Sequence, residues 1–402
     1  MDMVLDDLEV SFEDLNPFVP GAGRQPRELL GRDEEFEHVA VLIRRTQRRL
    51  PNRGVILTGL RGMGKTVLMR RMQELCDQGG LITAWVEARR EGAADDAAHA
   101  IMDELKAGSQ SLLSPSLREK VQRVIESIGS ISLGALGVSV GLSKDEENTR
   151  RESLLRQMNA LISHLAASAK SEKSGVVLFV DELQDMSPAV LGELISLQHE
   201  AGQRDLPFYL IGGGLPNLPR VLTRSRSYAE RLFEYRRIGS LPDEVSRQVF
   251  QQTVQSVGSS FDQDALDLLV GLAQGYPFFI QAYGDSTWDA ARDGRLDLQA
   301  VKRGMPQARA QLDTGLYSAR WQRASAAGQG YLRAMAEIGA AEGSGDEVLS
   351  SRVAQRLGRT LSALSPVRAT LIGQGLIYMP RNGAVAFTVP HMGEFVLRQK
   401  GL

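Results

Sequence analysis

Eight residues near the start of the chain constrain its fold more than any other feature. Gly59 to Thr66 read GLRGMGKT, which fits the phosphate-loop pattern of two glycines with four residues between them, followed by Lys and Thr. The motif follows an apolar run of strand length, VILT at 55–58, and opens a helical pattern from Lys65 to Cys76. Because such a loop works only between a strand and a helix, its context agrees with its sequence. We therefore predict an α/β fold built on a P-loop and a parallel sheet.

The residue types of this loop indicate ATP bound with Mg²⁺. Glycines let backbone N–H groups wrap phosphate oxygens, and the N-terminus of the next helix adds positive potential. We expect Lys65 to reach the β- and γ-phosphates and the Thr66 hydroxyl to coordinate Mg²⁺. The residues predicted to line the nucleotide are Gly59, Leu60, Arg61, Gly62, Met63, Gly64, Lys65, Thr66 and Val67. The alternative, an incidental glycine-rich turn, is disfavoured by the strand and helix on either side.

An acidic pair ends a second apolar run. Asp181 and Glu182 follow VVLFV at 176–180, where a P-loop protein has its second metal carboxylate and a base. We expect Asp181 to complete the Mg²⁺ shell with Thr66, and Glu182 to orient and polarise the attacking water. The pair could instead cap the helix that follows. The P-loop in the same chain favours the catalytic interpretation.

The remaining pattern divides the chain into four segments. They are an acidic tail at 1–28, an α/β core at 29–241, a helical lid at 242–315 and a C-terminal domain at 316–402. Strand and helix patterns alternate through the core, which predicts a parallel sheet covered by helices. A segment at about 91–172 reads as an insertion, with a helix at 115–128 and a glycine-rich stretch at 131–143 that fits a hairpin.

The C-terminal domain fits a winged helix-turn-helix. Helical patterns at about 319–338, 350–357 and 362–373 precede two strand-like runs joined by Asn382-Gly383, and Asn-Gly is a strong hairpin signal. Residues 320–402 hold ten Lys and Arg against five Asp and Glu, a balance that suits DNA. The side chains expected to meet phosphates are Arg352, Arg356, Arg359, Arg368 and Arg381. Because the excess is modest, docking of a protein remains the alternative.

Three segments together resemble a known family. GRDEEF at 31–36, the P-loop, and VVLFVDELQD at 176–185 are similar to the origin-recognition-complex-like and related STAND-type ATPases of the AAA+ class. The resemblance covers about 29–290. It implies an α/β core with a helical lid, in many members a winged helix, and a position of Gly31 and Arg32 near the adenine.

The resemblance also implies roles for two residues outside the main motifs. Pro277, in Gly275-Tyr276-Pro277, corresponds to a lid element that approaches the nucleotide, although a break between two helices explains the same residues equally well. Arg231 lies in the region from which relatives extend an arginine finger to a neighbouring subunit, which would imply a nucleotide-dependent homo-oligomer. The residues that compete for this role are Arg224, Arg226, Arg236 and Arg237.

Two departures from the family pattern indicate slow hydrolysis. Gly212-Gly213-Gly214 stands where many AAA+ ATPases have a polar water-orienting residue, and no obvious substitute precedes Asn217. The Gly-Tyr-Pro element also lacks the arginine that contacts the γ-phosphate in many members. We expect turnover below about 1 s⁻¹, under the usual enzyme range.

These features predict an ATP-dependent switch whose nucleotide state controls assembly and DNA binding. The alternative is a STAND-like signalling or defence ATPase whose C-terminal module binds a protein. A small-molecule kinase is disfavoured because the remaining length goes to a lid and a winged helix. The single Cys76 excludes an internal disulfide. The acidic start of the chain is the opposite of a signal peptide, and no apolar stretch approaches the roughly 20 residues of a membrane span, so we expect a cytoplasmic protein.

Overall fold

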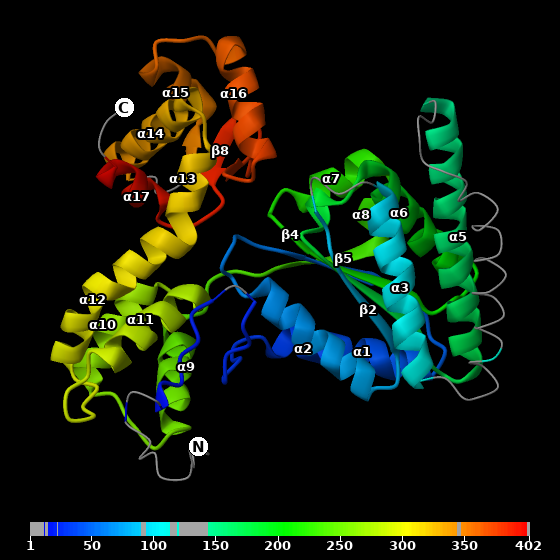
Figure 1. Ribbon diagram of the computed structural model, residues 1–402, viewed down its shortest axis with the longest axis horizontal. Helices are drawn as coiled ribbons and strands as arrows, with labels where there is room; N and C mark the ends of the chain where they lie inside the picture. The colour runs from blue at the N-terminus through cyan, green and yellow to red at the C-terminus, as the bar shows by residue number, and fades with distance from the viewer. Residues whose placement is uncertain are drawn as a thin grey trace, which may run out of the picture. The chain divides into compact units, whose positions relative to one another are not determined.

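The computed structural model describes residues 12, 15–21, 23–89, 94–112, 119, 144–343 and 347–399. The chain divides into two compact units (Figure 1). The first, here named the sheet unit, comprises 33–59 and 68–238; the second, the lid unit, comprises 1–32, 60–67 and 239–402. The hairpin expected at 131–143 and, apart from Glu119, the helix expected at 115–128 lie outside the described residues, as do the acidic residues of the tail other than Glu28.

The sheet unit contains five strands that all pair in parallel. They are β1 (Gly54–Thr58), β2 (Ile82–Glu87), β3 (Val176–Asp181), β4 (Phe208–Gly214) and β5 (Phe233–Arg237), in the spatial order β2-β3-β4-β1-β5. β1, β3 and β4 are buried along their whole length, as inner strands of a helix-covered sheet are. The predicted α/β fold with a parallel sheet is confirmed.

Helices of this unit pack on the sheet. They are α1 (Asp33–Gln47), α2 (Lys65–Gln78, whose first turn belongs to the lid unit), α3 (Ala94–Leu112), α5 (Lys144–Ser171), α6 (Pro188–Gln203), α7 (Leu218–Ser225) and α8 (Ala229–Leu232). One buried apolar cluster joins α3, α5 and α6 to the strands, with Leu105, Leu161 and Leu194 among its members. The described parts of the segment at 91–172 therefore share the core of the sheet.

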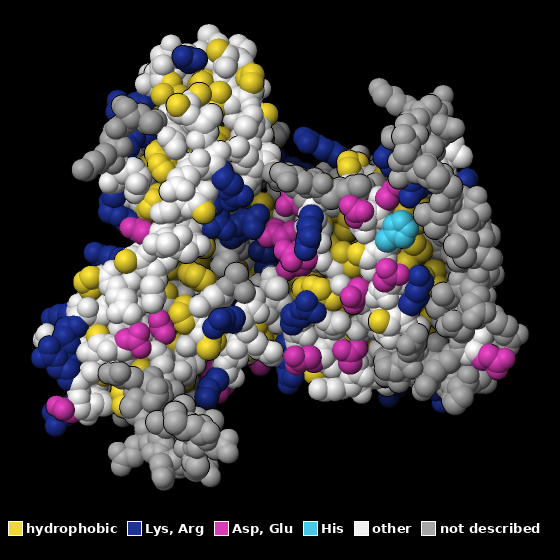
Figure 2. Space-filling view, in the orientation of Figure 1, with side chains coloured by type: hydrophobic (Ala, Val, Ile, Leu, Met, Phe, Trp, Pro, Cys, Tyr) yellow, Lys and Arg dark blue, Asp and Glu magenta, His cyan; other side chains and the backbone are white. Residues whose placement is uncertain are grey.

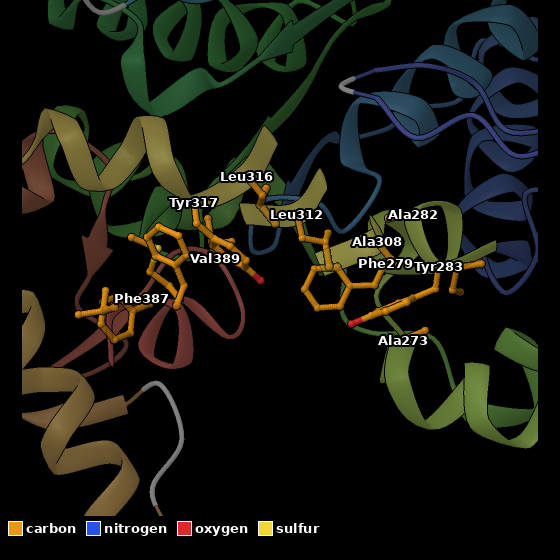
Figure 3. Close-up of a cluster of buried hydrophobic side chains, with 14 of the residues drawn as sticks. Ala273, Phe279, Ala282, Tyr283, Ala308, Leu312, Leu316, Tyr317, Phe387 and Val389 are labelled. Atoms are coloured by element: carbon orange, nitrogen blue, oxygen red, sulfur yellow. The ribbon is translucent and has the colours of Figure 1, made fainter. Parts of the chain in front are cut away.

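The part of the lid unit that follows residue 239 begins with four helices. These are α9 (Asp243–Gln255), α10 (Gln263–Ala273), α11 (Pro277–Asp289) and α12 (Leu298–Leu312). α12 continues without a break through a π-helical turn, Asp313–Ser318, into α13 (Ala319–Arg323). The buried cluster in Figure 3 follows the same path, from Phe279 and Tyr283 on α11 through Leu316 to Phe387.

The end of the chain forms a helix and a small antiparallel sheet with further helices. Its elements are α14 (Ala326–Glu342), β6 (Glu347–Leu349), α15 (Ser350–Arg356), α16 (Leu361–Gly373), β7 (Ile377–Tyr378), β8 (Ala384–Phe387) and α17 (Met392–Arg398), and the strands pair in the order β6-β8-β7. The single helix expected at 319–338 is two helices, because Ala324 is extended and the Ser325 side chain caps α14 at the N–H of Gly328. The sequence pattern did not indicate β6 or α17.

Part of the predicted N-terminal tail packs on the lid helices. Phe18 is only 4% exposed and lies beside the rings of Phe250 and Phe261, with centroids 6.2 and 6.4 Å away. The indole N–H of Trp288 donates to the carbonyl of Phe12 over 2.8 Å. Packing of the chain therefore begins before Leu29, where the sequence placed the start of regular structure.

Candidate functional site

The P-loop has the backbone that its glycines predict. Gly62 and Gly64 have φ angles of 81° and 82°, in the left-handed region that strains any residue with a Cβ. Lys65 begins α2, is 7% exposed, and its ammonium group donates to the carbonyl of Leu60 over 3.0 Å. Backbone that curls in this way before a helix N-terminus suits phosphate oxygens. The loop therefore fits the nucleotide that the sequence predicted.

The other loop residues lie as follows. Leu60 to Val67 all belong to the lid unit, whereas Gly59 belongs to the sheet unit, where a Cβ on it would come within 2.4 Å of the carbonyl oxygen of Ile238. The backbone N–H of Arg61 donates to the carbonyl of Thr388 over 3.1 Å. One edge of the loop is thus held by the C-terminal part of the same unit.

The acidic pair lies at the end of β3, in the sheet unit. The Asp181 carboxylate is 5% exposed and accepts from the backbone N–H of Glu182 over 2.9 Å. Glu182 itself is half-buried and has a left-handed backbone, with φ 49° and ψ 40°. Such a conformation costs a residue with a side chain roughly 1 to 3 kcal/mol, and it persists where the surroundings impose it. The two carboxylates have different partners, since that of Asp181 accepts from a backbone N–H and that of Glu182 from the side chain of Gln184.

The three glycines that end β4 are explained by the space around them. A Cβ on Gly212 would lie 2.5 Å from Leu183, and one on Gly213 would lie 2.4 Å from the sulfur of Met69 and 3.1 Å from Asp181 Oδ1. A Cβ on Gly214 would lie 2.3 Å from the side-chain oxygen of Gln184. Glycine is required because the turn after β3 packs directly on this strand. The polar residue expected here by analogy has no room on β4.

A polar side chain that the sequence motifs did not indicate reaches this place from the neighbouring turn. Gln184 lies in a short 3₁₀ turn, Leu183–Asp185, directly after Glu182. Its amide nitrogen donates to the carboxylate of Glu182, and its amide oxygen accepts from the backbone N–H of Leu215 over 3.1 Å. The signal in the sequence was a glutamine two residues after the base, together with three glycines at the end of a later apolar run.

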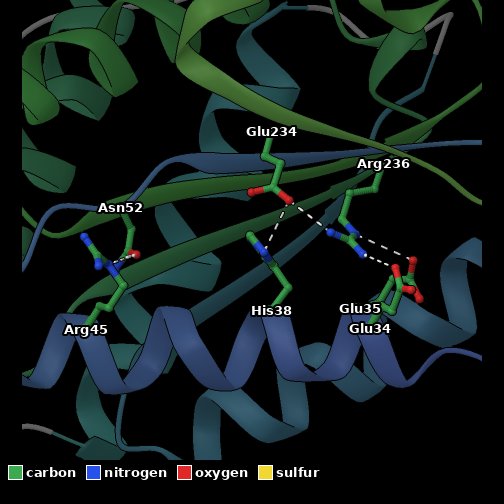
Figure 4. A network of polar contacts seen from close by, with 7 residues as sticks. All are labelled: Glu34, Glu35, His38, Arg45, Asn52, Glu234 and Arg236. Carbon is green, nitrogen blue, oxygen red and sulfur yellow. Dashed lines mark hydrogen bonds and ion pairs between the residues drawn. The ribbon is translucent and has the colours of Figure 1, made fainter.

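The candidate fingers differ in what they contact. Arg236 forms ion pairs with Glu34, Glu35 and Glu234 at 3.2, 3.6 and 3.0 Å (Figure 4), so its charge is used within the sheet unit. The guanidinium of Arg226 donates to the Ser196 hydroxyl and to a backbone carbonyl. Arg231, on α8, and the two other competitors, Arg224 and Arg237, are exposed. Arg236 and Arg226 are thus engaged in contacts within the sheet unit, which makes both weaker candidates for an arginine finger than Arg231.

The lid element meets the P-loop within the lid unit. Pro277 opens α11, and a methyl group on Gly64 would lie 4.0 Å from its Cγ. Gly275 has φ 74°, and a Cβ there would come within 2.1 Å of the carbonyl oxygen of Leu241. Gly275 therefore forms the turn between α10 and α11, while Pro277 borders the P-loop. The interpretation as a helix break thus fits Gly275, and the interpretation as a lid element near the nucleotide fits Pro277.

Gly31 and Arg32 pack at the beginning of the lid. A Cβ on Gly31, whose φ is 70°, would lie 2.8 Å from Val245 Cγ1. The guanidinium of Arg32 donates to the carbonyl of Gly239 over 2.7 Å. The pair thus fixes the entry of the chain against the segment that leads into α9.

Three of the five arginines expected to meet DNA are engaged with carboxylates. Arg352, Arg356 and Arg381 lie 2.7, 2.7 and 2.8 Å from Glu342, Glu337 and Glu347 respectively. On the face seen in Figure 2, uncharged and hydrophobic side chains cover much of the C-terminal part. The positive balance counted from the sequence is therefore partly neutralised at the surface.

Two features of the described residues concern metals and membranes. No group of three or more His, Cys, Asp or Glu side chains that could hold a metal occurs among them. Mg²⁺ at a P-loop keeps several waters and needs only one or two protein ligands besides phosphate. A hydroxyl from Thr66 and a carboxylate from Asp181 are oxygen ligands of the type that it takes. Within the same described parts, the helices are all too short or too polar to span a bilayer.

The sheet order and the two motifs define a P-loop nucleoside triphosphatase in which one strand, β4, separates the P-loop strand from the strand of the acidic pair. Residues 28–211 match the family described as AAA ATPase domain. The predicted resemblance to AAA+ ATPases is therefore confirmed over these residues. Residues 314–396 match a family described only as a domain of unknown function.

Of three similar solved structures, one has a TM-score above 0.5 and agrees with the fold. The Walker-type ATPase of Pyrococcus abyssi is 16% identical, with a TM-score of 0.56 over 96% of this chain and 100% of that one. The Orc1 protein of Aeropyrum pernix, solved in complex with DNA, is 17% identical, with a TM-score of 0.48 over 92% and 93%. Cdc6p of Pyrobaculum aerophilum is 14% identical, with a TM-score of 0.46 over 97% of each chain. No curated protein matches the sequence.

Proposed function

We propose that this protein binds ATP with Mg²⁺, hydrolyses it slowly, and uses the nucleotide state as a switch. The observation that carries the proposal is the P-loop itself: two glycines in the left-handed region lead into a helix that begins at a buried lysine. The AAA ATPase family match over residues 28–211 supports the same class of activity.

The residues divide the chemistry between them. Lys65 and the loop N–H groups neutralise and orient the phosphates. Thr66 and Asp181 would hold Mg²⁺, which would screen the negative charge of the phosphates. Glu182 accepts a proton from the attacking water. The N–H of Glu182 holds the Asp181 carboxylate, so the metal ligand and the base are positioned by one turn of backbone.

Arg231 extends the proposal to assembly. Its side chain is exposed on α8, where a cation would be available to the nucleotide of a second copy and would stabilise charge in the transition state. Mass in solution with and without ATP tests this step. A particle that stays monomeric in both conditions would rule out a finger supplied by a neighbour.

The central experiment compares wild-type protein with Lys65→Ala, with Lys302→Ala as the control. Lys302 is an exposed lysine on α12, so its loss removes the same charge away from the loop. Lys65→Ala should abolish useful ATP binding in an equilibrium titration, and Lys302→Ala should leave it unchanged. Phosphate release by the wild type at saturating ATP should be measurable but below about 1 s⁻¹. Unaltered affinity in folded Lys65→Ala protein would refute the assignment of the loop.

For the C-terminal part we propose a winged helix, and the charge pattern favours the docking of a protein over DNA. The order α14, β6, α15, α16, β7, β8 with a β6-β8-β7 sheet supports the fold. The exposed positions of α16 carry mainly Ser, Thr, Ala, Leu and Pro, and α16 is the second helix of the predicted helix-turn-helix pair, the position from which such modules read DNA. Phosphate binding relies on Lys and Arg, and the arginines nearby are largely paired with carboxylates.

DNA binding remains the competing prediction and has a direct test. If it is correct, the full chain shifts a generic duplex at low salt, and replacing Arg368 and Arg381 together by Ala lowers the slope of log affinity against log salt by about two contacts. The docking interpretation expects no measurable duplex affinity even at low salt. A binding isotherm for wild type and double variant separates the two.

A further inference from the structure

The absence of a polar residue at the end of β4 leaves open what orients the base. In the sheet unit, β4 lies beside β3 in parallel, with Val180 opposite Gly212. The acidic pair follows β3 immediately, so the end of β4 is the place from which a side chain could steer Glu182. The three glycines there have no side chains, and their neighbours leave no room for any.

Gln184 occupies the space that the glycines leave. Its side chain is half-buried, and its oxygen would be 2.3 Å from a Cβ on Gly214. The amide therefore lies directly on the backbone of β4 at the point where the strand ends. A larger residue at 214 would expel it.

The two contacts of Gln184 fix which way its amide faces. The backbone N–H of Leu215 can only donate, so the amide oxygen faces it, at 3.1 Å. The amide nitrogen then faces the Glu182 carboxylate and donates to it. A carboxylate gains more from such a bond than a neutral acceptor does, because charge-assisted hydrogen bonds are roughly twice as strong.

The backbone of Glu182 explains why a second restraint matters. Its backbone is left-handed, and the turn is closed by bonds between backbone groups, including the N–H of Asp185 to the carbonyl of Glu182 at 2.7 Å. Those bonds hold the main chain but not the side-chain torsions of a glutamate. The amide of Gln184 supplies a restraint on the carboxylate end.

We propose that Gln184 is a positioning residue for ATP hydrolysis: it holds the carboxylate of Glu182 in the orientation that polarises water and anchors it to the end of β4. The inference rests on the proposed function. It assigns to the turn after β3 the task that many AAA+ ATPases give to a side chain on β4.

The test uses two variants of the full chain. Gln184→Glu keeps the shape and an acceptor for the Leu215 N–H, but replaces the donor to Glu182 by a repelling oxygen. Gln184→Ala removes both contacts without adding charge, and it serves if the glutamate disturbs folding. Gln198→Ala is the matched control, because Gln198 also bonds to the backbone of β4, at Phe208 and Leu210, but belongs to α6.

Loss of an outer-shell partner typically lowers activity 10- to 100-fold. We expect kcat to fall by about that factor in both Gln184 variants, with the ATP dissociation constant within about twofold of wild type because the P-loop is unaltered. Folded Gln198→Ala should keep kcat within about threefold, since it loosens the strand without touching Glu182. A kcat within twofold of wild type in the Gln184 variants, or an equal loss of affinity and kcat, would overturn the proposal.

A double-mutant cycle separates positioning from general damage. If Gln184 acts through the Glu182 carboxylate, adding Gln184→Ala to Glu182→Gln should cost nothing more in residual turnover. Independent losses that multiply would show that Gln184 acts elsewhere, which contradicts the inference. Failure of the proposed function looks different: the wild type itself would release no phosphate, whereas failure of this inference leaves wild-type hydrolysis intact.

Discussion

Replacing Phe18 by Ala should destabilise the lid unit strongly, although the residue lies in what the sequence marks as a tail. Its ring is buried beside Phe250 and Phe261, and it approaches α11 so closely that a Cβ on Gly284 would lie 2.3 Å from it.

The magnitude follows from the burial. A buried aromatic side chain removes about 150 to 250 Å² from water, which at about 25 cal/mol per Å² amounts to about 4 to 6 kcal/mol. Alanine retains the Cβ, and measured Phe to Ala changes in cores cost about 3 to 5 kcal/mol. We therefore expect a loss of about 3 to 5 kcal/mol. Phe18→Leu keeps most of the volume and should cost under about 1.5 kcal/mol.

Trp288 provides the readout, since its ring stacks on Phe12 at 4.1 Å in the same unit. In a background with Trp85→Phe and Trp321→Phe, the emission of Trp288 follows the lid unit by itself during urea unfolding. The midpoint should fall with an unchanged slope, because only stability differs. A loss below about 1 kcal/mol for Phe18→Ala, with Phe18→Leu no milder, would refute the packing argument.

Three further predictions concern single residues. Glu182→Gln should retain ATP and Mg²⁺ affinity while phosphate release falls by about 10² or more, since the amide keeps the shape but not the base; near-normal turnover would assign the water to another group. Burial raises the pKa of the Cys76 thiol, and neighbouring Asp77 adds to the effect, so a thiol reagent at pH 8 should label the unfolded chain but not the folded one. Gly284→Ala should cost about 1 to 3 kcal/mol by overpacking against Phe18, and a neutral effect on the urea midpoint would show that the ring can move.

The sequence was most informative at positions where the local structure requires a particular type of residue. The glycines of the P-loop indicated a backbone that can wrap phosphates, and the apolar runs at 55–58 and 176–180 indicated parallel strands. The structure has left-handed backbone at Gly62 and Gly64 and a strand at each run. The acidic pair was found because it ends a strand that lies in the interior of the sheet. These features are local, so periodicity and turn chemistry suffice to find them.

What the sequence could not provide depends on contacts between distant segments. Gln184 becomes meaningful only when β4 lies beside β3, and the glycines at its end read as a gap until their neighbours are known. The slow turnover predicted from that gap now rests only on the missing lid arginine. Phe18 looked like part of a tail because its partners lie more than two hundred residues away, and β6, with three residues, carries too short a pattern to detect.

The uninterrupted helical path from α12 through the π-helical turn into α13 has a consequence for how lid and C-terminal part communicate. The path runs from Leu298 to Arg323, roughly 39 Å at about 1.5 Å per residue, and the predicted boundary between residues 315 and 316 falls inside it. A flexible loop between the lid helices and the C-terminal part would transmit a displacement but not a rotation. A continuous helix transmits a rotation as well. Because each residue turns a helix by about 100°, one residue inserted here would swing α14 to β8 through about that angle while moving them little along the axis. We therefore expect natural variation to preserve the rotational register of this helical segment more strictly than its length.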